Sequence, residues 1–439
     1  MRRTGRLVMA AVAAATLAIA IVPLGCGSDD SSDGPTPTPT PTSSGGATPT
    51  PTPTPAAGAR IIDLVPSIGD TPRFDVGGGA RGFLVAFEDD GPPSSSIRGL
   101  RLGADGTPID ADPFLVSVAQ SAGYLGDPSW TSPAVGFNGS LYGVVYAGTG
   151  TVQGSIPGAA ITAVQVGSDG SVELPTDLAE TAQIGTCESN VGPPPAISGN
   201  NATSFVALWP LEEGCAGGPI LDRLDGAFAI VENRGFAVIE TDPLLPPVDD
   251  DPVVSSAAAV ASSGTTTVGA WTEMPAGGGE VDVEVAVLAN GSTQRTRLAE
   301  AGGGLVRPSI ASDGADFLVV WQSAPGTISG ARFRSGSGPL DGGSGFVVAR
   351  ASGGGMLGAP RVAFAGGTYL VAWVEGSDLR VVEVSPQGGV GSAQTLATNA
   401  AGTTIALASS GGTFVLPFVV DATSGGSSTR TLKAAVLQP

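Results

Sequence analysis

A five-residue apolar run recurs seven times along this chain, and each copy ends in a large aromatic residue. The runs are FLVAF (83–87), YGVVY (142–146), FVALW (205–209), TVGAW (267–271), FLVVW (317–321), YLVAW (369–373) and FVLPF (414–418). Self-similarity at a period of roughly 45 to 60 residues is typical of a fold that repeats one small unit around an axis. The repeat therefore constrains the architecture more than any other feature of the sequence.

Each copy contains four short apolar segments separated by turn residues. The clearest copy, residues 307–352, reads PSIAS, FLVVW, ISGARFR and GFVVARA, with Gly-containing turns between the segments. Short strands joined by such turns predict an antiparallel meander, and four strands per copy is the blade of a β-propeller. The sequence thus predicts an all-β, seven-bladed propeller of four-stranded antiparallel blades. The expected blades are 72–127, 128–190, 191–252, 253–306, 307–358, 359–402 and 403–439 together with 60–67.

The second segment of each copy is apolar on both faces, as FLVVW shows. A strand with one face in water alternates apolar and polar residues, so these runs are expected between packed blades. The large aromatic residues are accordingly interpreted as core residues.

The two ends of the repeat region complement each other. The last copy has only three strand segments, whereas RIIDLVPS (60–67) stands as an unmatched strand before the first copy. Pairing of this segment with the C-terminal blade would close the ring and remove two exposed sheet edges.

The best copies, RPSIASDGADFLVVW and APRVAFAGGTYLVAW, resemble the repeats of secreted bacterial propeller proteins and lipoproteins, most of them uncharacterised. The resemblance spans residues 60–439, is strongest in copies five and six, and implies the fold without any activity.

The first 59 residues are expected to be an export signal and a tether. Arg2, Arg3 and Arg6 precede an apolar stretch, which predicts a signal peptide over 1–25. PLGC (23–26) resembles the lipobox of bacterial lipoproteins, which implies lipid attachment at Cys26. Residues 26–59 are rich in Pro, Thr, Ser and Gly, a composition typical of an extended disordered linker. By the same resemblance, Gly27 after the cysteine favours the outer membrane or cell surface, with the lipid anchor in the membrane.

Charge and composition exclude several classes of function. The net charge of −20 opposes binding to nucleic acid, and no partner chain is implied, so we expect a monomer. The chain has no His, which excludes Ser-His-Asp and Cys-His catalysis and every His-containing metal site. The sialidase-type Asp box, calcium loops of the integrin type and Walker-type phosphate loops are also missing from the sequence.

Acidic residues gather in the loops that a propeller places on one face. We call this set the acidic rim; it contains Glu88, Asp89, Asp90, Glu212, Glu213, Asp249, Asp250 and Asp251, with Glu273, Glu375 and Asp421 in equivalent loops. Converging carboxylates could bind Ca²⁺ or a cationic partner. The alternative is that these charges simply face water. No metal site or other cofactor is predicted with more specificity than this.

Cys187 and Cys215 are the other two cysteines of the chain. An exported protein meets an oxidising compartment, so we expect them to form a disulfide that stabilises the long insertions of the third copy. A catalytic or metal-binding role is disfavoured because no His or basic neighbour would activate the thiols.

Two functions remain open from the sequence. The missing catalytic motifs and the tether favour a non-enzymatic binding or interaction module that is anchored to the membrane and contacts a protein or glycan. The alternative is a carboxylate-dependent extracellular glycan hydrolase or lyase, because glycoside hydrolysis needs only two carboxylates.

Overall fold

The computed structural model describes residues 59–69, 73–89, 96–118, 129–130, 133–152, 156–182, 195–201, 204–212, 224–232, 238–243, 253–255, 258–264, 266–275, 279–289, 292–302, 304–424 and 427–438. All lie in one compact unit, Thr52–Pro439. Over these ranges the chain is almost entirely strand, with a single 3-10 turn, η1 (Ser352–Gly354). No helix in this part of the chain is long and apolar enough to cross a bilayer.

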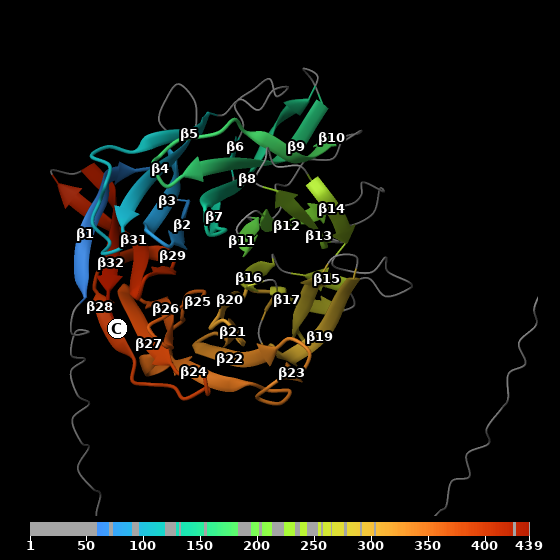
Figure 1. Cartoon of the computed structure of the whole chain (residues 1–439). Helices are drawn as coiled ribbons and strands as arrows, with labels where there is room; N and C mark the ends of the chain where they lie inside the picture. Colours follow the sequence, from blue (N-terminus) through green and yellow to red (C-terminus); the bar gives the residue numbers. More distant parts are fainter. Residues whose placement is uncertain are drawn as a thin grey trace, which may run out of the picture. The chain divides into compact units, whose positions relative to one another are not determined.

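The described strands pair into seven antiparallel sheets, which form the blades of a β-propeller (Figure 1). Three sheets have four strands: β2 (Phe74–Gly79), β3 (Gly82–Asp89), β4 (Ser96–Gly103) and β5 (Phe114–Val118); β11 (Ala196–Asn201), β12 (Ser204–Glu212), β13 (Leu224–Glu232) and β14 (Val238–Pro243); and β25 (Arg361–Ala365), β26 (Thr368–Glu375), β27 (Asp378–Val384) and β28 (Gln394–Ala397).

The other four sheets have five strands: β6 (Ser129–Trp130), β7 (Ala134–Phe137), β8 (Leu141–Val152), β9 (Ile156–Gly167) and β10 (Thr176–Ala182); β15 (Val253–Ser255), β16 (Ala259–Ser263), β17 (Thr266–Pro275), β18 (Asp282–Ala289) and β19 (Ser292–Glu300); β20 (Ser309–Ser312), β21 (Phe317–Ala324), β22 (Thr327–Arg334), β23 (Gly338–Pro339) and β24 (Phe346–Arg350); and β29 (Ala400–Ile405), β30 (Ala408–Ser410), β31 (Thr413–Ser424), β32 (Ser427–Leu437) and β1 (Arg60–Ile68). These sheets depart from the expected four strands in each blade.

Each sheet has one innermost strand, which contacts the innermost strand of the next sheet. These contacts follow the order β2, β7, β11, β16, β20, β25 and β30, and β30 contacts β2 again. Figure 1 shows the sheets arranged around the centre that these strands surround.

The N-terminal strand joins the C-terminal sheet, as the sequence predicted. β1 pairs antiparallel with β32, from Arg60 opposite Val436 to Ile68 opposite Arg430. Leu64, Val65 and Ile68 are buried in a cluster that includes residues of the first and the last sheets. The expected pairing of the two ends of the repeat region is therefore confirmed.

The apolar runs are buried on both faces, which confirms their interpretation as core. In β21, all five residues from Phe317 to Trp321 are buried, and Trp321 and Trp373 are among the largest fully buried side chains. The side chain of Trp209 lies outside the described residues.

Glycine pairs make the tight turns between first and second strands that the sequence predicted. Gly366 and Gly367 both have positive φ (59° and 83°) and join β25 to β26 through the pair Ala365–Thr368. Two consecutive positive φ values define the type I′ turn, which glycine adopts without steric cost.

Arg–Asp pairs on the third strands connect neighbouring sheets. Arg332 on β22 pairs with Asp341 and donates from Nη1 to the carbonyl oxygen of Pro386, 2.9 Å away, in the next sheet. Arg101 on β4 repeats this arrangement with Asp110 and the carbonyl oxygen of Ser168, at 3.0 Å. Each arginine thus joins its own sheet to the sheet that follows.

Candidate active site

One position of the repeat brings a side chain from six of the seven sheets to the centre of the ring. It is the innermost-strand residue that pairs with the fourth residue of the apolar run. In three copies it is alanine, namely Ala134, Ala196 and Ala259, and in three it is Asp75, Ser309 and Arg361. In the last copy the equivalent residue is Ala406, which lies between β29 and β30 and does not line the central cavity. Alanine leaves room at the centre, and the three polar exceptions place chemical groups there.

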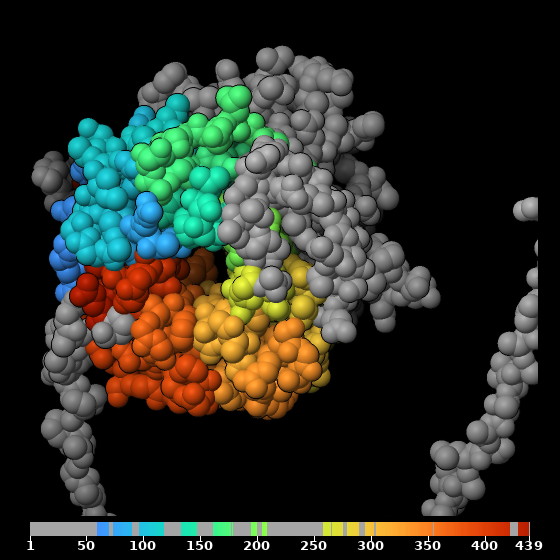
Figure 2. Space-filling view, viewed as in Figure 1, coloured from blue at the N-terminus to red at the C-terminus, as the bar shows by residue number. Residues whose placement is uncertain are grey.

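The residues from these six sheets line a cavity of about 200 Å³. Its wall is formed by the innermost strands of six sheets and the residues just before them, and by Thr404 and Leu407 in the last sheet; Figure 2 shows the hollow at the centre of the molecule. Apolar residues are the more numerous in the lining, but the surface exposed to the cavity is more polar than apolar, and the polar side chains are those of Asp75, Arg307, Ser309, Arg361 and Thr404. A few placed polar groups among apolar residues are typical of a small-molecule site. The cavity is smaller than the roughly 300–1,000 Å³ that is usual for pockets holding drug-sized ligands, so it suits a ligand of about the size of a single sugar residue.

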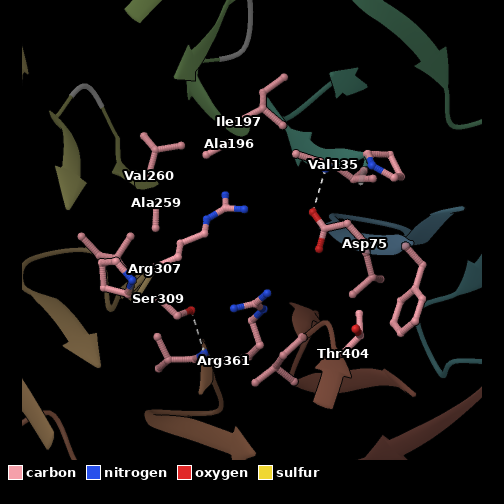
Figure 3. Close-up of a pocket in the computed structure, with 18 residues that line it drawn as sticks. Asp75, Val135, Ala196, Ile197, Ala259, Val260, Arg307, Ser309, Arg361 and Thr404 are labelled. Carbon is pink, nitrogen blue, oxygen red and sulfur yellow. Dashed lines mark hydrogen bonds between the residues drawn. The ribbon is translucent and has the colours of Figure 1, made fainter. Parts of the chain in front are cut away.

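Asp75, Arg307 and Arg361 point toward one another across this cavity (Figure 3). Asp75 lies on β2, Arg361 begins β25, and Arg307 stands two residues before β20. Arg307 and Arg361 belong to consecutive sheets, whereas Asp75 comes from the first sheet, far away in the sequence, so the closed ring is needed to bring all three together.

Burial raises the pKa of Asp75 above its ordinary value of 3.8. The opposing influences are hydrogen bonds from the amides of Val135 and Val76 and the positive charges of Arg361 and Arg307. The Val135 amide donates to Oδ2 over 2.8 Å and fixes the carboxylate in the cavity. A carboxyl group whose pKa is raised by burial is suited to proton transfer closer to neutral pH.

The two arginines are held by backbone carbonyl groups rather than by carboxylates. Arg307 donates from Nη2 to the Pro195 oxygen over 3.1 Å, and Arg361 donates from Nε to the Ile405 oxygen over 3.1 Å. Burial, together with repulsion from Arg361, lowers the pKa of Arg307 to about 10, and burial also lowers the pKa of Arg361. Both guanidinium groups remain charged at neutral pH.

The cavity opens at the ends of the innermost strands where the acidic rim also begins. Phe74, next to Asp75, pairs with Phe87, directly before the rim residues Glu88 and Asp89. Glu88 is buried and accepts from Arg73 over 3.1 Å, and Asp89 accepts from Arg98 over 2.6 Å.

The remaining described rim residues also face arginines. Glu375 pairs with Arg380 and Asp421 pairs with Arg430, at 3.1 and 3.0 Å. Asp90, Glu213 and Asp249 to Asp251 lie outside the described residues, as does the side chain of Glu212. In the part of the chain that the structure describes, no group of three or more acidic or Cys side chains is arranged to hold a metal ion. Calcium binding by the complete rim stays a prediction.

A pair of buried carboxylates lies outside the cavity wall. Glu273 and Glu284 both contact Arg295, and Glu273 also accepts from the indole of Trp271 over 3.1 Å. Burial raises the pKa of Glu284. Because Arg295 bridges the two carboxylates on one face of their sheet, the cluster is structural.

Cys26, Cys187 and Cys215 all lie outside the described residues. The lipid attachment and the disulfide therefore stay predictions.

Sequence reasoning missed Asp75, Arg307 and Arg361. For Asp75 and Arg361 the available signal was the departure from alanine at one repeat position, but it is visible only once the register of each innermost strand is known. Arg307 stands two residues before that position in its copy, so this signal does not mark it. The expected catalytic groups were instead sought in loops.

No family model and no curated protein matches this chain. Among solved structures of similar fold is a prolyl endopeptidase with 16% identity and a TM-score of 0.45, covering 84% of this chain and 47% of its own. A Trypanosoma rangeli sialidase shows 8% identity and a TM-score of 0.45, covering 86% and 58%. A Pyrococcus horikoshii acylaminoacyl peptidase shows 9% identity and a TM-score of 0.42, covering 80% and 50%. This chain thus spans roughly half the length of these solved chains.

The expectation of a non-enzymatic binding module is corrected by this comparison, because these solved propeller structures are hydrolases. The physical reason for the error is that a propeller assembles its centre from distant strands and needs no local catalytic motif. At these identities and TM-scores the likeness concerns the fold alone and assigns no chemistry to this chain.

Proposed function

We propose that this protein is a carboxylate-dependent enzyme that cleaves a glycan in the central cavity. The observation that carries the proposal is the Asp75 carboxyl group, which faces Arg307 and Arg361 in the central cavity. Because the chain lacks His, a proton must be moved by another group, and among the described side chains of the cavity wall Asp75 is the one carboxyl group.

Asp75 has the properties that proton transfer requires. Its raised pKa brings the carboxyl group nearer to the pH at which it can both take and give a proton. The amide of Val135 fixes its orientation. Apart from Asp75, the wall offers guanidinium and hydroxyl groups that bind polar substituents of a sugar.

A panel of neutral and acidic polysaccharides tests the proposal. The purified wild-type chain should release new chain ends from at least one of them. Asp75→Asn keeps the size and an amide oxygen as acceptor for Val135, and it should lower kcat/KM roughly 100-fold or more. Asp112→Asn, an exposed position outside the cavity, is the matched control and should leave the rate unchanged. Full activity of Asp75→Asn with an unchanged thermal midpoint would contradict the proposal.

We also propose that the enzyme is exported and lipid-anchored at Cys26, at the outer membrane or cell surface. The support is the order of basic start, apolar stretch, lipobox-like PLGC and Pro/Thr-rich linker. Replacement Cys26→Ser should move the protein from the membrane fraction to the soluble fraction; retention in the membrane fraction would contradict the anchor.

The finer architecture follows as a proposal from the strand pairing. We infer that the seven sheets are seven blades with four strand positions each, one position being split where a fifth strand occurs. The support is that β29 and β30 share one edge of β31, and β23 and β24 share one edge of β22.

A further inference from the structure

The two arginines of the cavity differ from arginines elsewhere in the described chain. Arg332 and Arg101 are each paired with a carboxylate, whereas the hydrogen bonds of Arg307 and Arg361 within the described residues go to backbone carbonyl oxygens. Carbonyl groups fix the direction of a guanidinium without neutralising it. The remaining N–H groups point into the cavity with Asp75 opposite (Figure 3).

The charges of the cavity do not balance. Two guanidinium groups face one carboxyl group, so the site carries one surplus positive charge when Asp75 is ionised and two when it is protonated. Buried charges are costly unless they are paired, and two neighbouring cations also repel each other. The structure therefore maintains an unfavourable arrangement that an incoming anion would relieve.

We infer that Arg307 and Arg361 bind the carboxylate of a uronic acid residue, and that the glycan is cleaved by β-elimination with Asp75 as the base. This inference rests on the proposed function for the statement that the ligand is a glycan. The anion site itself depends only on the two guanidinium groups.

A single carboxylate fits the cavity in charge, shape and size. One negative charge matches the surplus present when Asp75 is ionised, and planar guanidinium groups match the planar carboxylate. The cavity of about 200 Å³ accepts one sugar residue, so the recognised group belongs to the sugar that reacts. The net charge of −20 repels long polyanions, and we therefore expect short acidic oligosaccharides to bind better than polymers.

The number of carboxylates favours elimination over hydrolysis. Hydrolysis by the usual routes uses two carboxyl groups on either side of the glycosidic bond. Among the described residues of the cavity wall, Asp75 is the only one. Elimination needs one base, provided that the charge of the substrate carboxylate is neutralised, which is the task of the two arginines.

The atoms of this step balance without a co-reactant. Asp75 takes the proton on C5 of the uronic acid, next to its carboxylate. The electron pair of that C–H bond forms the double bond between C4 and C5, and the bond from C4 to the glycosidic oxygen breaks. The leaving oxygen takes a proton from solvent, and Asp75 later returns its proton to solvent, so no water is consumed.

Cleavage products and pH dependence distinguish the two reactions. With short oligogalacturonates as the probe, elimination gives a product with an ultraviolet-absorbing double bond, lighter by one water than the hydrolysis product. A base must be ionised, so kcat/KM should rise as the pH increases through the Asp75 pKa, which lies above 3.8. If Asp75 were a general acid, kcat/KM would fall over that range. A saturated product or a falling profile would overturn the elimination.

Arginine variants test the anion site directly. Arg307→Gln and Arg361→Gln should each lower kcat/KM for oligogalacturonates about 100-fold, whereas Arg350→Gln, an exposed control outside the cavity, should change it less than twofold. The thermal midpoint of the two cavity variants should stay equal or rise, because each removes an uncompensated buried charge. A structural arginine would lower it.

Calorimetry with the full chain separates this inference from the proposed function. Galacturonate should bind to the wild type and fail to bind to either cavity variant, while glucose should not bind. Tighter binding of a sulfated sugar without a carboxylate would overturn the uronate assignment. Cleavage of neutral glycans that is unaffected by both arginine variants would overturn the inference and leave the proposed function standing. Galacturonate binding without any cleavage would retain the anion site and refute both the elimination and the enzyme.

Discussion

Leu64 offers the sharpest test of ring closure, because it lies on the N-terminal strand β1 but is buried with residues of the first and last sheets. It is 8% exposed. Leu64→Ala removes three carbon atoms, each worth about 0.8 kcal/mol when buried, which gives a transfer loss of about 2.2 kcal/mol after the exposed fraction is discounted. The cavity that remains raises the expected loss in unfolding free energy to about 3 kcal/mol.

Guanidinium unfolding followed by tryptophan fluorescence measures this loss as a lower transition midpoint at unchanged slope. Leu174→Ala is the matched control, since Leu174 is 85% exposed and the same substitution there should cost about 0.4 kcal/mol. If the two variants had equal midpoints, β1 would contribute no burial to the ring, and the closure argument would be refuted.

Two further predictions concern an ion pair and a close backbone approach, both in the first sheet. Arg101 lowers the pKa of Asp110 below 3.8 through their hydrogen bonds. The pair therefore stabilises the fold above pH 3.8, and this contribution is lost as the pH falls through the lowered pKa. Arg101→Gln should make the acid-unfolding curve less steep in that range, and an unchanged curve would show that the pair contributes nothing. Gly78→Ala would place its Cβ 1.9 Å from a carbonyl oxygen of β30 and should destabilise the chain by roughly 2 kcal/mol or more. As a control, Gly343→Ala places its Cβ in open space and should change the thermal midpoint little. Equal midpoints for the two variants would contradict the close approach of the first and last sheets.

Much of the fold could be predicted because its causes are local and repeated. The run FLVVW is apolar at every position, so it must be buried on both faces wherever it lies, and Gly366–Gly367 specify a tight turn by their backbone freedom alone. The partner of β1 could be anticipated because an unmatched strand and an incomplete last copy are both visible in the sequence. The fifth strands were missed because they arise where long strands meet irregular segments, which no repeat pattern specifies.

The candidate site could not be predicted in the same way. Asp75 lies more than two hundred residues before Arg307 and Arg361, and no sequence motif relates the three residues. The rim acids were recognised as charged loops, but their arginine partners, such as Arg380 for Glu375, lie on the neighbouring strand and depend on register. The sequence pattern therefore pointed to the loops, whereas the structure places the candidate site on and beside the innermost strands.

By itself the sequence determined that the chain repeats, that its runs are buried on both faces, that its two ends complete one sheet, and that histidine chemistry is excluded. These properties follow from composition and periodicity, which act on each segment separately. Only the tertiary structure decided which side chains share the centre, because ring closure converts equivalent repeat positions into neighbours across one cavity. The balance of two guanidinium groups against one carboxyl group is a property of that closure, and the chemistry proposed for this protein depends on it.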